Sequence, residues 1–151
     1  MQSKPPEKKP LKKRSRLVVD TGVLISAFVF GGTPAKAVRK AFNETDIFVS
    51  PDLLNEYRSV PIELEAKGKI SHVQFKSLIS SIATFVANAV IVHPIKKVTL
   101  CRDPKDDMLL ECCIAARARF LISGDKDLLV LEEVPFDLKI ITSREFLQLT
   151  L

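Results

Sequence analysis

Cysteine and histidine are scarce in this sequence, with three cysteines and two histidines among 151 residues. Cys101, Cys112 and Cys113 do not have the spacing of a zinc site, and their odd number leaves one unpaired in any disulfide scheme. His72 and His93 stand apart from the cysteines and from each other. These absences exclude a His/Cys metal centre and indicate a reducing compartment, which we expect to be the cytoplasm.

The sequence also lacks an apolar run long enough to cross a bilayer. A basic start, an apolar stretch from Leu17 to Phe30 and the small residues around Lys36 imitate a signal peptide. Asp20 within that stretch and the odd cysteine count argue against export. We therefore expect no membrane partner.

Positive charge is concentrated at the start of the chain. Residues 1–16 carry seven Lys or Arg and one Glu, a net of +6, and the remaining residues have a net charge of −1. Residues 1–15 are therefore expected to form a basic flexible tail, either a solubilising arm or a tether for nucleic acid. Residues 16–151, in a chain with 46% apolar content, are sufficient for one folded domain.

Short apolar runs alternate with segments of helical periodicity. The expected strands are 17–19, 47–49, 89–92, 120–123 and 138–141, and Thr21 with Gly22 is expected to turn the chain into a short helix over 23–30. Further helices are expected over 33–42, from 52 until Pro61 kinks or ends the helix, from 72, over 103–117 and over 142–149. This order predicts an α/β fold, a three-layer α/β/α sandwich with a central mostly parallel sheet of four to five strands.

Four carboxylates occupy similar places in this arrangement. Asp20 ends the first strand, Glu56 lies on the helix after the second, Asp107 lies in the first turn of a helix, and Asp125 follows the fourth strand. If they share one cleft they repel each other unless a cation is present. Mg²⁺ or Mn²⁺ is the natural occupant, because hard cations prefer oxygen ligands.

Each acid also has a purely structural interpretation. Asp20 could terminate a strand, Glu56 could be solvated, Asp107 could favour the helix dipole and Asp125 could cap a helix. Asp103 and Asp106 are assigned the dipole role, and Glu111 and Asp127 are left as extra acids. Lysine and arginine near these acids in the sequence are candidates for a phosphate-binding rim: Arg39, Lys40, Lys105 and Lys126.

Four motifs together resemble the PIN domain family: LVVDTGVLIS from Leu17, SPDLLNEY from Ser50, DMLLECCIAA from Asp107 and FLISGDKDLL from Phe120. The resemblance covers about residues 16–147. It is nearest to the branch described as toxin components of toxin–antitoxin systems, the VapC-like ribonucleases. The departures are the Cys112-Cys113 pair, which replaces small residues, and Pro61 within a helix.

The resemblance implies a PIN-like nuclease domain over residues 16–151 that hydrolyses RNA phosphodiester bonds as a metal-dependent endoribonuclease. It implies Mg²⁺ or Mn²⁺ bound by Asp20, Glu56, Asp107 and Asp125, with Asp127 as an additional acid and Thr21 and Ser123 as supporting hydroxyls. It further implies a cognate antitoxin protein and a homodimer as partners.

Three alternatives remain. The Val-Val-Asp-Thr-Gly turn has the form found in aspartic proteases, but the chain has only one such turn and that chemistry requires two aspartates. A receiver domain would need paired acids after the first strand, where Asp20 stands alone. A PIN-like module that binds RNA or protein without cutting is the main competitor.

Overall fold

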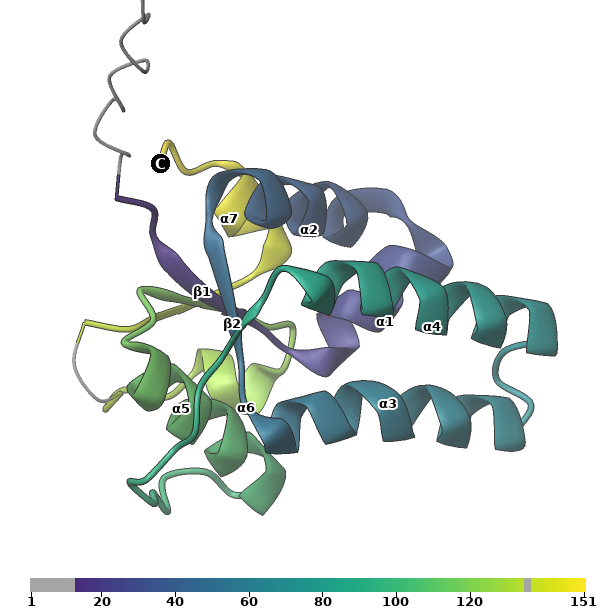
Figure 1. Ribbon diagram of the computed structural model, residues 1–151. Helices are drawn as coiled ribbons and strands as arrows, with labels where there is room; N and C mark the ends of the chain where they lie inside the picture. Colours follow the sequence, from purple (N-terminus) through teal and green to yellow (C-terminus); the bar gives the residue numbers. More distant parts are fainter. Residues whose placement is uncertain (1–12, 135–136) are drawn as a thin grey trace, which may run out of the picture.

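The computed structural model describes residues 13–134 and 137–151, so the expected basic tail lies almost entirely outside the described residues. The described chain forms five strands and seven helices (Figure 1). The strands are β1 (Arg16–Val19), β2 (Asp46–Val49), β3 (Val90–Ile91), β4 (Phe120–Ile122) and β5 (Lys139–Ile141). The helices are α1 (Thr21–Phe30), α2 (Gly32–Glu44), α3 (Pro51–Ala66), α4 (His72–Ala87), α5 (Pro104–Ala116), α6 (Lys126–Leu129) and α7 (Ser143–Leu147).

The five strands make one sheet in the order β3-β2-β1-β4-β5, and every pairing is parallel. β1 therefore lies in the centre, with the chain moving to one side for β2 and β3 and to the other for β4 and β5. The predicted three-layer α/β/α fold with a mainly parallel sheet is confirmed. In such sheets ligands bind where the strand order reverses, at the carboxyl ends of the strands.

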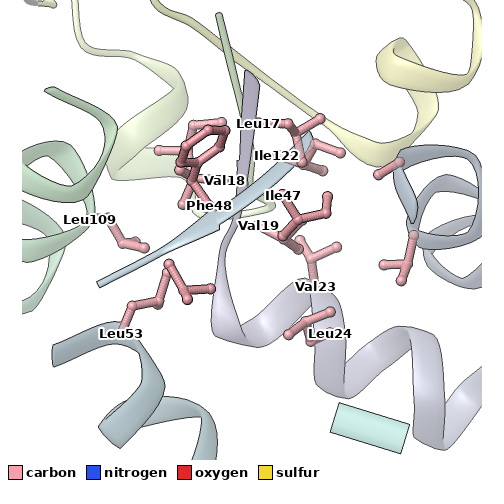
Figure 2. Packing of buried hydrophobic residues seen from close by; sticks show 14 of the residues in the cluster. Leu17, Val18, Val19, Val23, Leu24, Ile47, Phe48, Leu53, Leu109 and Ile122 are labelled. Carbon is pink, nitrogen blue, oxygen red and sulfur yellow. The ribbon is translucent and has the colours of Figure 1, made fainter. Parts of the chain in front are cut away.

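Helices cover both faces of the sheet because its central strands are apolar on both sides. Leu17, Val18 and Val19 are all fully buried, as a parallel strand between two helical layers requires. Figure 2 shows Leu109 of α5 on one side of the sheet and Val23 and Leu24 of α1 on the other. Figure 1 shows α3 and α4 extending beyond the sheet as a pair of neighbouring helices.

The helix starts follow their capping residues. The Ser50 and Asp103 side chains accept hydrogen bonds from the backbone N–H groups of Leu53 and Lys105, and a proline follows each cap. Complete capping boxes start α4 and α7. These are local rules, which explains why the sequence located these starts well.

Two predicted boundaries were wrong. Thr21 and Gly22 belong to α1, because Asp20 rather than Gly22 is the N-cap residue. α3 continues through Pro61 to Ala66. Leu53, Tyr57 and Pro61 are spaced by four and all buried, so the proline ring packs in the core and this packing offsets the lost backbone hydrogen bond.

Within residues 13–134 and 137–151, no single helix has the length and apolar character to span a membrane, although the bent pair α1 and α2, at 113°, meets those criteria jointly.

Arg117 ends α5 in an unusual backbone conformation. Its φ of 51° and ψ of 47° lie in the left-handed region, and it is the only described residue other than glycine with a positive φ. Glycine is the common residue at such a helix end because it has no Cβ to clash with the carbonyl oxygen. Arg117 is exposed, so its side chain gains little from burial in return.

Arg117→Gly is expected to raise the free energy of unfolding by about 1 kcal/mol, since the left-handed conformation costs roughly that much for a residue with a Cβ. Thermal unfolding should shift upward by about 2–4 °C. Arg117→Ala is the matched control, because it removes the same side chain and keeps the Cβ. Equal stability of the Gly and Ala variants would contradict this explanation.

Candidate functional site

The centre of the candidate site is the pair of neighbouring strand ends, β1 and β4. Val19 is in register with Ile122, and the Asp20 N–H donates to the Ile122 carbonyl oxygen at 3.0 Å. Immediately beyond, the Ser123 hydroxyl donates to Asp20 Oδ2 at 2.7 Å. Two residues 103 positions apart in the sequence are thus joined directly at the point where the strand order reverses.

Asp125 is held beside this pair by the loop that follows β4. Its N–H donates to Ser123 Oγ at 3.0 Å, and its Oδ1 accepts from the Asp127 N–H at 2.9 Å. The second bond makes Asp125 the N-cap of α6, as the structural interpretation expected. Asp125 is also near enough to Asp20 for its negative charge to raise the pKa of that carboxyl, after the larger effect of burial.

Glu56 reaches the same place from α3. The neighbouring Tyr57, which is fully buried, donates its hydroxyl proton to the carbonyl oxygen of Val19. This bond ties α3 to the end of β1, so Glu56 is positioned next to Asp20 and the buried Thr21. Burial and the negative charge of Asp20 raise the pKa of Glu56.

Asp106, the residue before the predicted Asp107, is the aspartate of α5 that faces Asp20 and Asp125. Asp106 is buried, and its pKa is raised to about 6 by burial and by the negative charges of Asp125, Asp103 and Asp20. Asp107 turns elsewhere: its Oδ1 accepts from the N–H groups of Leu100 and Cys101 at 2.9 and 2.8 Å. Burial alone would raise the pKa of Asp107, but these two bonds lower it.

Neighbouring positions on a helix point about 100° apart, so only one of two consecutive aspartates can face the cluster. Leu109, Cys113 and Ala116, which follow Asp106 at helical spacing, are all buried, whereas Arg117 on the stripe assumed for Asp107 is exposed. The packing of this stripe sets the rotation of α5 and so decides that Asp106 faces the cluster, which no feature of the sequence alone indicates. We use "acidic cluster" below for Asp20, Glu56, Asp106 and Asp125.

The donor chemistry of the acidic cluster suits a divalent cation. Carboxylate oxygens are the ligands that Mg²⁺ prefers, and three of the four carboxyl pKa values are raised by burial together with neighbouring negative charge. The buried Thr21 hydroxyl lies close enough to the Glu56 carboxylate to lower the pKa of that carboxyl, although no hydrogen bond of good geometry joins the two groups. In the same part of the chain, however, no three acidic, His or Cys side chains are close enough as arranged to hold one ion.

Other predicted residues lie outside the cluster. The Glu111 carboxylate accepts from the Val98 N–H at 3.3 Å and lies 3.6 Å from the Lys97 ammonium. Asp127 is exposed. Its backbone N–H donates to Asp125 Oδ1, and no contact of its carboxylate is seen among the described residues. The assignment of Asp127 as a metal ligand therefore stays a prediction.

The four cations expected on the rim divide into two groups. The Lys40 ammonium donates to the carbonyl oxygens of Phe146 and Leu149 at the end of α7. Arg39 lines a groove between α1, α2 and α4. Lys105 lies near Glu56, and Lys126 follows Asp125 directly, so these two remain beside the acidic cluster.

The chain matches known proteins in three comparisons. The family model described as PIN domain matches residues 16–127. The uncharacterized protein MJ1680 of Methanocaldococcus jannaschii is 26% identical over 146 residues, which cover 91% of this chain and 92% of that protein. A chain in the crystal structure of VapBC2 from Rickettsia felis, bound to a DNA fragment from their promoter, matches the fold with a TM-score of 0.57 and 12% identity, over 84% of this chain and 98% of that chain.

The contrast between Asp106 and Asp107 predicts opposite effects of the same substitution on stability. The raised pKa of Asp106 means that the folded protein binds this proton more tightly than the unfolded chain, so stability falls as pH rises from about 4 to about 6. Asp106→Asn should therefore raise the melting temperature of the metal-free protein at pH 7. The pKa of Asp107 is lower in the folded protein than in the unfolded chain, so this carboxylate stabilises the fold at pH values above the unfolded pKa. That stabilisation is lost on acidification. Asp107→Asn should therefore lower the melting temperature at pH 7.

The measurement is thermal unfolding in EDTA at pH 7 and at pH 4, with shifts of a few degrees expected at pH 7 and smaller shifts at pH 4. A stabilising Asp107→Asn together with a destabilising Asp106→Asn would place Asp107, and not Asp106, among the repelling acids.

Proposed function

This chain belongs to the PIN domain family, and from that premise we propose that it is a divalent-metal-dependent ribonuclease that hydrolyses RNA phosphodiester bonds. The observation that supports this most is the acidic cluster. Four segments distant in the sequence bring carboxylates to one edge of the sheet, where burial and mutual repulsion raise the pKa values of three of them. Such an arrangement costs stability unless a cation balances it.

We assign Asp20, Asp106 and Asp125 as the residues that would hold Mg²⁺ or Mn²⁺, with Glu56 completing the shell. When bound, the ion supplies positive charge that lowers the pKa of the attacking water and neutralises charge on the phosphate. Asp107, the predicted ligand, is replaced by Asp106 in this proposal because its carboxylate is occupied by the backbone of Leu100 and Cys101.

The chain's own groups orient the reaction. Ser123 fixes the Asp20 carboxylate through its hydroxyl, and Tyr57 holds α3 against the end of β1. Glu56 orients the water and accepts its proton at the carboxylate. The Thr21 hydroxyl, which lies beside the Glu56 carboxylate, can donate to that carboxylate or to a phosphate oxygen.

A regulatory partner is part of the proposal. A solved structure that shares this fold is a VapBC2 complex, and the sequence resembles toxin components of such systems. We propose that this chain is the toxin of a toxin–antitoxin pair, acts in the cytoplasm and is restrained by a cognate antitoxin protein. Homodimerisation rests on the family resemblance alone.

A second candidate is a PIN-like module that binds RNA or protein without cutting it. The specific observation in its favour is that no three of the described acidic side chains are placed to ligate one ion as they stand. The two functions differ in whether RNA is cut when a divalent ion is supplied.

Cleavage of a fluorescent RNA is expected in Mg²⁺ or Mn²⁺ and not in EDTA. Asp20→Asn and Asp106→Asn should each lower kcat/KM by about 100-fold or more, because each removes a charge that acts on the transition state. Asp107→Asn is the matched neighbour and should retain most activity wherever the protein is folded. Cleavage that survives both EDTA and Asp20→Asn would rule out the mechanism.

Divalent ions should stabilise the folded protein by mass action and so raise its melting temperature. At a free ion concentration of 100 Kd the free energy of unfolding should rise by about 2.7 kcal/mol. The increase in melting temperature should be larger at pH 7 than at pH 4, because the acidic cluster is more charged at pH 7. Asp20→Asn should reduce this increase. Substitution of Glu111, an acid on the same helix that pairs with Lys97, should leave it unchanged. An equal increase for the wild type and Asp20→Asn would place the ion elsewhere.

A further inference from the structure

The edge of the sheet opposite the acidic cluster carries a row of cations. Arg119 N–H donates to the Arg16 carbonyl oxygen at 2.8 Å, and Lys139 N–H donates to the Arg119 carbonyl oxygen at 2.9 Å. These backbone bonds place basic residues at the amino ends of three adjacent strands, β1, β4 and β5. Arg117 lies next to them at the end of α5. We call Arg16, Arg117, Arg119 and Lys139 the basic edge.

The two strand-end arginines are held in place by aromatic rings. The Arg16 guanidinium lies 5.2 Å from the centre of the Phe48 ring and donates to the Ala116 carbonyl oxygen at 3.1 Å. The Arg119 guanidinium lies 5.0 Å from the centre of the Phe120 ring. Stacking on a ring leaves the N–H groups at the guanidinium rim free to bind an anion.

The charge of the basic edge is not neutralised within the described part of the protein. All four side chains belong to exposed residues, and none forms an ion pair within 4.0 Å there. Asp46, in register with Arg16, and Asp137, which lines the same concave surface as Arg117, Arg119 and Lys139, are the nearby acids. Lys13 and Arg14 add two more exposed cations where the chain enters β1.

Arg117 supplies an independent indication. It occupies a left-handed backbone position where glycine is the favourable residue. The residue is exposed and lines the concave surface, which encloses a volume of about 770 Å³. Left-handed residues are common at helix ends, where glycine is the usual choice, and strained backbone positions are frequent at functional sites. A long cationic side chain at this position is explained if it contacts a binding partner.

We propose that the basic edge binds the phosphate backbone of single-stranded RNA, as a second contact surface separate from the acidic cluster. This rests on the proposed function for the choice of RNA. The cations lie along hydrogen-bonded strand ends, which are spaced by about 4.8 Å, and a line of this kind fits a linear polyanion. None of the described residues lining the surface is an exposed large apolar side chain of the kind that inserts into lipid.

The test is binding of a fluorescent 20-nucleotide RNA to the full-length chain in EDTA, measured by anisotropy across a KCl series. The variant combines Arg117→Gly, Arg119→Gln and Lys139→Gln. Its affinity at low salt should fall by about tenfold or more, and the slope of log K against log salt should become shallower by about 2, because three phosphate contacts are lost. Arg117→Gly should also raise the melting temperature, so weaker binding cannot be attributed to unfolding.

The matched control removes three exposed lysines around the α3–α4 connection, Lys67, Lys69 and Lys76, each replaced by glutamine. It has the same net charge as the test variant and should keep the wild-type salt slope. Equal loss in the two variants would overturn the proposal, because it would reflect net charge alone. Unchanged affinity of the test variant for RNA, accompanied by loss of binding to anionic phospholipid vesicles, would overturn it in favour of a membrane surface.

Binding in EDTA does not depend on cleavage, so this result stands apart from the fate of the proposed nuclease function. With Mg²⁺ present, cleavage of the 20-nucleotide RNA should show a raised KM in the test variant. Cleavage of a dinucleotide, whose single phosphodiester group must lie at the acidic cluster and leaves none for the basic edge, should be unchanged. A protein that binds through the basic edge but cuts neither RNA would retain this inference and lose the nuclease mechanism.

Discussion

The hydrogen bond from Ser123 to Asp20 is the contact on which the candidate site depends. It exists because β1 and β4 are neighbours in a parallel sheet, so residues that directly follow them lie at the same edge. The same hydroxyl accepts from the Asp125 N–H and thereby sets the direction of the following loop. One small side chain thus binds the Asp20 carboxylate directly and fixes Asp125 through its backbone N–H, and fully buried strand residues form a close-packed scaffold beneath it.

The acidic cluster and the core are connected through a second bond, from Tyr57 to the Val19 carbonyl oxygen. Tyr57 belongs to the buried face of α3 that also contains Leu53 and Pro61, so the packing of this face determines where Glu56 lies. The raised pKa values in the cluster are the cost of gathering acids there without a cation. A domain of this size can carry that cost because its core is continuous across both faces of the sheet.

The fold and the outline of the site could be predicted because the deciding patterns are local. Capping residues marked the helix starts, and apolar runs marked the strands.

Two features of the structure could not be predicted from local sequence patterns. Pro61 remains helical because α3 buries its ring, a tertiary effect. The sequence does not reveal that Leu100 and Cys101 bind the Asp107 carboxylate, because the segment that contains them has no periodic pattern. The choice between adjacent aspartates depends on about 100° of helix rotation, which only packing determines.

The two edges of the sheet carry opposite charge, and this follows from the polarity of parallel strands. Every strand begins at one edge and ends at the other, so acids placed after strands and cations placed before them are separated in space even though the folded residues are close to neutral overall. A phosphate chain is repelled by the acidic cluster until a divalent ion is bound there, whereas the basic edge attracts it whether or not that ion is bound, to a degree that falls with ionic strength. Under the proposed function, attachment of RNA and its cleavage are separate events with separate requirements. A nuclease arranged in this way would hold its substrate before the metal site is complete, and the metal would govern the chemical step alone.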